Sequence, residues 1–69
     1  MLIKINDTLA VNSRYVVSVD LNTATEFGKS VYGMSIHILN AAQPIELKFM
    51  HDAERMFLYD RISRALNNG

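Results

Sequence analysis

The stretch Pro44-Ile45-Glu46-Leu47-Lys48-Phe49-Met50-His51-Asp52 marks the point where the hydrophobic spacing of the chain changes. Ile45, Leu47 and Phe49 alternate with charged residues, which is the two-residue period of a strand with one buried face. Beyond this stretch, apolar residues recur every three or four positions, as they do along one face of a helix. The sequence therefore predicts a strand that passes directly into a C-terminal helix covering about residues 53–66.

The predicted helix has one apolar stripe, which we expect to pack on the inner face of a sheet. The stripe consists of Leu58, Ile62, Ala65 and Leu66, with Tyr59 at its edge. Asp52 is a candidate N-cap, because its carboxylate can accept hydrogen bonds from the free backbone N–H groups of the first turn. The run Asn67-Asn68-Gly69 predicts the end of the helix.

Two-residue periods also run through most of the chain before Pro44. They predict strands around Ile3–Ile5, Leu9–Val11, Tyr15–Leu21 and Ser30–Leu39, with a polar connection over Asn22–Lys29. In the third strand, the expected core-facing residues are Tyr15, Val17, Val19 and Leu21, and the expected solvent-facing residues are Val16, Ser18 and Asp20. Strands followed by a helix are typical of the α+β class. We therefore expect a single α+β domain over residues 1–69: an antiparallel sheet of about four strands at about residues 2–50, with one C-terminal helix packed across one face.

Composition narrows the class of protein. The chain has 69 residues and no Cys, so a small core must form without disulfides or thiolate metal sites, and such chains often gain burial by self-association. Seven Lys and Arg balance seven Asp and Glu, whereas binders of nucleic acids or membrane surfaces usually carry a basic excess. Met1–Asp7 has no signal-peptide pattern, and no run approaches the ~20 apolar residues of a membrane span. We expect a cytoplasmic homo-oligomer that binds another protein and no membrane; nucleic acid is a disfavoured partner.

Motifs of known catalytic, metal and nucleotide sites are missing from the sequence, and its carboxylates form no spaced pattern. His37 is predicted on the outer face of the central strand, within reach of Glu46 or Lys48, where an ordinary half-exposed histidine is the expected role. His51 lies at the junction of strand and helix, next to Asp52, which is not a chelating spacing. We therefore expect no enzymatic activity, no metal and no cofactor.

The best candidate for a binding site is a second face of the predicted helix. Phe57 lies roughly opposite Ile62, with Arg61 and Arg64 four and seven residues beyond it and Met56 beside it. An exposed Phe flanked by Arg and Met has the composition of an interface core. The alternative is a rotated helix, in which Phe57 covers an edge of the core. The first hypothesis is a small non-catalytic protein-binding module, a homodimer that acts as a regulator, adaptor or inhibitor of a larger protein.

Two further hypotheses stay open. A small-ligand or nucleotide binder would have a site between subunits, built from the loop residues Thr23, Thr25, Phe27 and Lys29 together with Arg14 and His37. In this loop, Phe27-Gly28 places an aromatic ring at the expected hairpin tip, either tucked onto the sheet or offered to a partner. A nucleic-acid-binding regulator would use Arg55, Arg61 and Arg64 of the helix, although the neutral net charge weighs against it.

Several short motifs resemble the small bacterial FlbD-like proteins. They are Ile3-Lys4-Ile5-Asn6-Asp7, Val11-Asn12-Ser13, Val16-Val17-Ser18-Val19 and Ile45-Glu46-Leu47-Lys48-Phe49, followed by a helix that begins near Asp52. The sequence departs from the family at Thr23–Lys29 and in its longer, Arg-bearing helix. The resemblance implies a sheet-plus-helix fold and a small regulatory adaptor, and it assigns no functional residue. Chains of this size and plan are also frequent among accessory proteins of phages and plasmids, which usually bind and inhibit a host protein.

Overall fold

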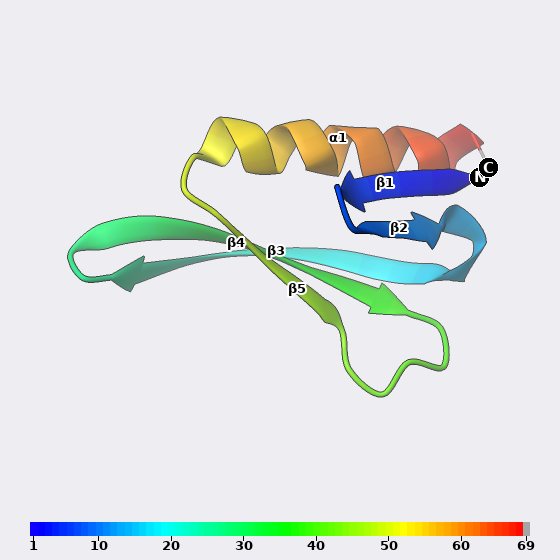
Figure 1. Cartoon of the computed structure of the whole chain (residues 1–69), viewed down its shortest axis with the longest axis horizontal. Coiled ribbons are helices and arrows are strands. Elements are labelled where there is room, and N and C mark those ends of the chain that lie inside the picture. Colours follow the sequence, from blue (N-terminus) through cyan, green and yellow to red (C-terminus); the bar gives the residue numbers. More distant parts are fainter. Residues whose placement is uncertain (69) are drawn as a thin grey trace.

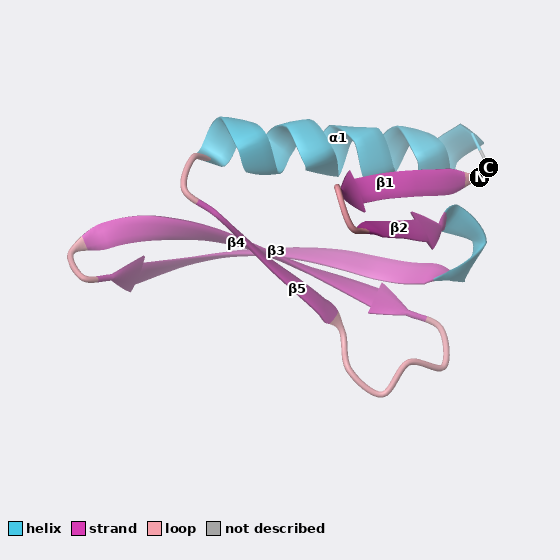
Figure 2. Ribbon diagram, viewed as in Figure 1, coloured by secondary structure: helices cyan, strands magenta, loops and turns pink. Residues whose placement is uncertain are grey.

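The computed structural model describes residues 1–68 and has an α+β fold, as the sequence predicts (Figure 1, Figure 2). Its elements in chain order are β1 (Leu2–Asn6), β2 (Leu9–Asn12), a 3₁₀ turn η1 (Ser13–Tyr15), β3 (Val16–Glu26), β4 (Lys29–Ile38), β5 (Ile45–Phe49) and α1 (Asp52–Asn68). The strands form two antiparallel sheets, β1-β2 and β3-β4-β5, in place of the expected sheet of about four strands. Figure 1 shows α1 running alongside β1, while the β3–β4 hairpin extends past the start of the helix.

The core lies between the two sheets and the helix. Its buried apolar residues are Ile3, Ile5, Met34, Ile36, Leu58, Ile62 and Ala65. Met34, Ile36 and Ile62 are almost completely buried, at 1%, 0% and 1% exposure, and each contributes roughly 1.5–3 kcal/mol of hydrophobic stabilisation. The helical stripe is thus confirmed at Leu58, Ile62 and Ala65, which all lie in this core. Leu66 departs from it, because its side chain remains 39% exposed.

A β-bulge at the start of β3 overturns the expected alternation of faces there. Val16 lies opposite Ile38 and Ser18 lies opposite His37, so Val17 is an extra residue without a partner in β4. Val16 and Val19 therefore both pack against the core, while Val17 turns outward and is 64% exposed.

Two more residues expected in the core are partly exposed. Tyr15 belongs to η1 and is 53% exposed. Leu21 lies opposite Met34, but β3 is the outer strand of its sheet and the Leu21 side chain remains 38% exposed. The prediction that Tyr15 faces the core was therefore wrong, whereas Leu21 shares the sheet face of buried Met34, as predicted, and is only partly covered.

The expected polar connection over Asn22–Lys29 is instead the distal part of a long β-hairpin. Pairing between β3 and β4 continues to Glu26 and Lys29, and only Phe27 and Gly28 form the turn. Their φ angles are 53° and 76°, the two positive values of a type I′ turn. Residues 22–30 are all exposed, so their polar composition reflects solvent around both faces of the hairpin and not the end of the strand.

Candidate functional site

The second helical face predicted from the sequence lies at the surface. Phe57 is 68% exposed and Met56 is 41% exposed, so Phe57 does not cover an edge of the core. The guanidinium of Arg61 lies over the Phe57 ring, 5.2 Å from its centroid. Arg64 Nε lies 3.0 Å from Asp60 Oδ2, in an ion pair across one turn of the helix. The helix thus presents an apolar ring whose neighbouring cation is held in place by a cation–π contact.

This face borders a groove between the helix and the N-terminal strand, which we call the β1–α1 groove. The groove has a volume of about 370 Å³. Its lining residues are Met1, Leu2, Ile3 and Lys4 on one side, and Phe57, Asp60, Arg61, Arg64 and Ala65 on the other. Three of the four predicted interface residues line it, and Met56 lies outside. Its volume is within the range of protein pockets that take small ligands or single side chains of a partner.

The two walls of the groove are joined by one hydrogen bond. Arg61 Nη1 donates to the backbone carbonyl oxygen of Lys4 at 3.3 Å. Buried Ile3 and Ala65 belong to the core, whereas Leu2 is 73% exposed at the rim. Exposed apolar side chains on both walls give a contacting molecule apolar surface to cover.

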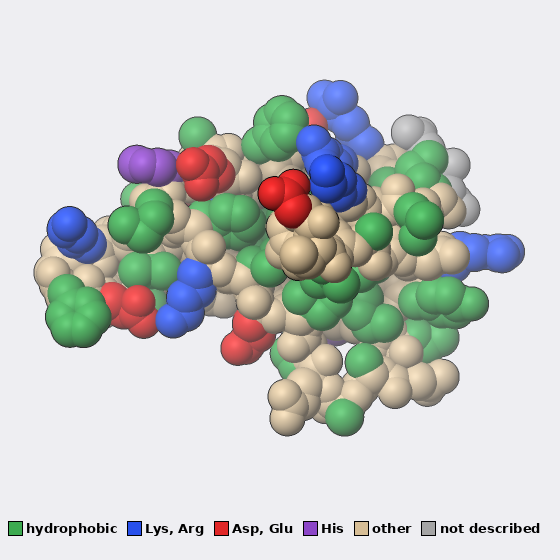
Figure 3. All heavy atoms as spheres, in the orientation of Figure 1, with side chains coloured by type: hydrophobic (Ala, Val, Ile, Leu, Met, Phe, Trp, Pro, Cys, Tyr) green, Lys and Arg blue, Asp and Glu red, His purple; other side chains and the backbone are tan. Residues whose placement is uncertain are grey.

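The charge of the groove differs from that of the chain. The whole sequence is neutral, but the lining holds Lys4, Arg61 and Arg64 against Asp60 alone, an excess of two positive charges. Figure 3 shows cationic side chains beside hydrophobic ones over α1 and β1 on this face. Asp60 pairs with Arg64, and Lys4 Nζ lies 3.7 Å from Asp7, outside the lining. Such a surface favours acidic partners with apolar side chains.

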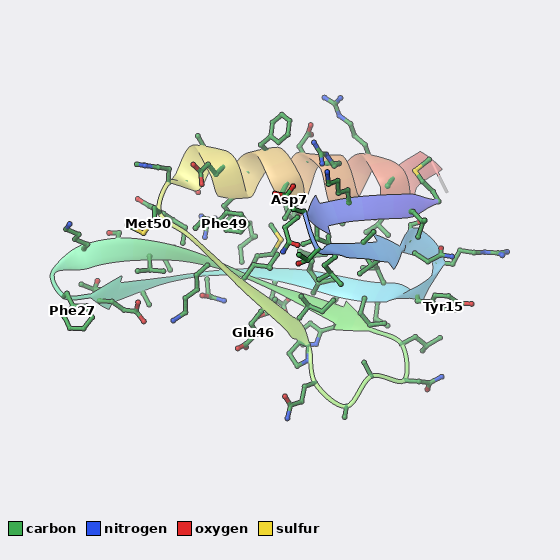
Figure 4. All side chains as sticks on the ribbon, in the orientation of Figure 1. Asp7, Tyr15, Phe27, Glu46, Phe49 and Met50 are labelled. Carbon is green, nitrogen blue, oxygen red and sulfur yellow. The ribbon has the colours of Figure 1, made fainter. Side chains whose placement is uncertain are left out.

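The six residues of the predicted ligand loop are not brought together within one chain. Arg14 lies in η1, just before β3, whereas Phe27 follows the other end of β3. Figure 4 shows Phe27 at one end of the molecule and Tyr15, the residue after Arg14, at the other. Thr25 and Lys29 flank the hairpin turn. Phe27 is fully exposed at the tip, so its ring is not tucked onto the sheet.

His37 and Thr23, the remaining two residues of the predicted ligand site, each contact a residue outside that site. His37 Nε2 lies 2.9 Å from Asp20 Oδ2 on the neighbouring strand, a partner that the sequence did not suggest. Thr23 Oγ1 lies 3.5 Å from Arg55 Nη1. A ligand site built from the six residues would therefore need a second chain.

Arg55 is buried, although the sequence suggested it for an exposed basic surface of the helix. Only 9% of it is exposed, so it is not part of a helical surface for nucleic acid. Its Nη1 donates to the carbonyl oxygen of Asn22 at 2.7 Å, and its Nε and Nη2 bond Asp52 Oδ1 at 3.1 and 2.7 Å. Its guanidinium also lies 5.2 Å from the centroid of the Tyr32 ring. Arg55 thus ties the first turn of α1 to the β3–β4 hairpin.

One signal in the sequence points to this burial. Arg55 precedes Leu58 by three residues and Ile62 by seven, which places it on the buried stripe of the helix. Asp52, expected as an N-cap, is the first helical residue, and its carboxylate accepts from Arg55.

Comparison with known proteins gave no matching family model, no similar curated protein and no similar solved structure. The resemblance to the FlbD-like proteins therefore stays a prediction. In the part of the chain that the structure describes, no helix has the length and apolar character needed to cross a bilayer. Among residues 1–68, no three His, Asp or Glu side chains gather as a metal site would require.

Proposed function

We propose that this protein is a small non-catalytic binding module that regulates, recruits or inhibits a larger protein through the β1–α1 groove. The observation that carries the proposal is the exposed Phe57 ring on the wall of a groove with a cationic excess. A partner side chain that covers Phe57 and Leu2 removes apolar surface from water, which supplies affinity. The cations orient the partner and speed its association.

The groove favours this function over the two alternatives. A nucleic-acid surface on the helix loses Arg55, which is buried in contacts with Asp52 and Asn22. A ligand site on the hairpin lacks Arg14 and His37, which lie elsewhere on the chain. Arg61 and Arg64, in contrast, lie beside Phe57 on one wall of one groove.

The test compares two exposed phenylalanines. The wild-type chain, Phe57→Ala and Phe27→Ala are immobilised, and the proteins that each retains from a cell extract are identified. Both side chains are exposed, so both variants should fold, which circular dichroism checks. We expect a protein retained by the wild type and Phe27→Ala and lost with Phe57→Ala. Loss with Phe27→Ala alone would move the binding surface to the hairpin tip and contradict the proposal.

Self-association is tested on the same proteins. The homodimer predicted from the sequence would bury Phe57 of both copies, so sedimentation over a dilution series should show a dimer that Phe57→Ala weakens. A wild-type monomer at every concentration would remove the dimer from the proposal and leave the groove open for another protein. A dimer that Phe57→Ala leaves unchanged would place the contact elsewhere.

A further inference from the structure

Among residues 1–68, no strand occupies the second edge of the β1 backbone. In an antiparallel pair, the N–H and C=O groups of one residue point to the same side, and successive residues alternate in direction. The carbonyl oxygen of Met1 accepts from Ser13 N at 2.8 Å, on the side of β2. The carbonyl oxygen of Lys4 accepts from Arg61 across the groove. Leu2 and Lys4 therefore direct their backbone groups away from β2, into the β1–α1 groove.

Such an edge is a template for another strand. Within residues 1–68, β1 pairs with β2 alone, and Arg61 donates to the Lys4 carbonyl oxygen. In strand addition, main-chain hydrogen bonds supply affinity, and alternate side chains of the added segment supply specificity. The groove also offers Phe57 for an apolar side chain and a net positive charge for acidic ones.

We propose that the partner docks as an extended segment that adds to the free edge of β1, between β1 and α1, with acidic side chains alternating with apolar ones. This inference rests on the proposed function and specifies the partner. The added backbone bonds the groups of Leu2 and Lys4 and displaces Arg61 from the Lys4 carbonyl oxygen. The acidic side chains lie near Lys4, Arg61 and Arg64, and the apolar ones cover Phe57. Charge complementarity selects this occupant, because the chain is neutral and the groove is not.

The probe is a capped eight-residue peptide that alternates Glu and Val, and its charge-reversed control alternates Lys and Val. Each is titrated into the full chain, and amide exchange is followed by NMR. At about 90% saturation with the acidic peptide, the Leu2 and Lys4 amides should exchange about tenfold more slowly, because only the free tenth of the protein exchanges. The Ile3 and Ala10 amides are internal controls: Ile3 faces β2, and Ala10 faces the opposite edge of the hairpin.

A matched pair of charge reversals tests the role of the groove. Arg64→Glu should weaken binding of the acidic peptide about fivefold and strengthen binding of the basic one, since it cancels the positive excess. Lys29→Glu changes the net charge equally but lies at the hairpin tip, and it should leave both affinities nearly unchanged. Equal effects of the two reversals would overturn the charge argument.

The outcomes separate the two proposals. If the peptide changes the chemical shifts of Phe57 and Ala65 but does not slow amide exchange at Leu2 and Lys4, strand addition is overturned and the groove remains the binding site. Equal binding of the two peptides, or no binding of the acidic one, would overturn the proposed partner chemistry, whereas the extract experiment with Phe57→Ala would still stand. Slower exchange at Ala10 in place of Leu2 would move the added strand to the other edge of the β1–β2 hairpin.

Discussion

Replacement of Arg55 by alanine should destabilise this protein more than any other single removal of charge. The side chain is 9% exposed and holds the start of α1 against the β3–β4 hairpin. Its truncation removes the donor to the Asn22 carbonyl oxygen and two bonds to Asp52, together with the contact over Tyr32. The carbonyl oxygen of Gly33, 3.5 Å from Arg55 Nη1, also loses its neighbour.

The size of the effect follows from these contacts. A hydrogen bond from a charged donor contributes about 1.5–3 kcal/mol, and a desolvated cation–π contact contributes about 1–2 kcal/mol. Because Asp52 is half exposed and water can replace the donor there, we expect a net loss of about 3 kcal/mol. A domain of 69 residues has a free energy of unfolding of roughly 3–10 kcal/mol. The loss corresponds to a Tm lower by about 12–24 °C.

The assay is thermal unfolding followed by circular dichroism, with Arg64→Ala as the matched control. Arg64 is on the same helix, but its side chain is 77% exposed and its ion pair with Asp60 contributes below about 0.5 kcal/mol. Arg55→Lys keeps the charge but lacks the planar fork of donors, and it should recover only part of the loss. A Tm of Arg55→Ala equal to that of Arg64→Ala would refute the structural role of Arg55.

Three further predictions concern the sheets and their core. Phe27→Asn should raise the Tm by several degrees, because asparagine adopts a positive φ more readily than phenylalanine; an unchanged or lower Tm would contradict the type I′ turn. Val17→Thr should change the free energy of unfolding in urea by less than about 0.5 kcal/mol, whereas Val19→Thr should cost about 1–2 kcal/mol. Equal costs would show that the bulge is absent. Ile36→Ala should cost about 2–5 kcal/mol, since the side chain is completely buried; calorimetry that finds a smaller loss would place Ile36 outside the core.

Local periodicity was sufficient to predict most of the elements. The alternation of Ile45, Leu47 and Phe49 and the helical recurrence of Leu58 and Ile62 correctly placed β5 and α1. The same spacing placed Phe57 on the outer face of the helix, where it is exposed. These predictions succeeded because the face on which a side chain lies within one regular element depends only on its sequence position.

The bulge and the distal hairpin were not predictable in this way. The extra residue Val17 breaks the alternation of side chains between the two sheet faces, so residues before it and after it no longer follow one two-residue period. Nothing in the sequence Tyr15–Leu21 marks the position of this bulge. At Thr23 and Thr25, the polar side chains suggested a loop although β-branched residues favour strands. Pairing with β4 decided that these residues form a strand.

The sequence by itself determined the α+β class and the apolar stripe of the helix, because each depends on residues within a few positions of one another, and it left the exposure of Phe57 to the structure. Only the tertiary structure decided that five strands form two sheets, that Arg55 is buried, and that strand β1 forms the second wall of the groove. Lys4 and Arg61 are 57 residues apart in the chain, and their contact depends on how the β1–β2 hairpin and the helix pack on the core. A local hydrophobic period carries no information about that packing, because it fixes which face of an element is buried and leaves open which element covers it.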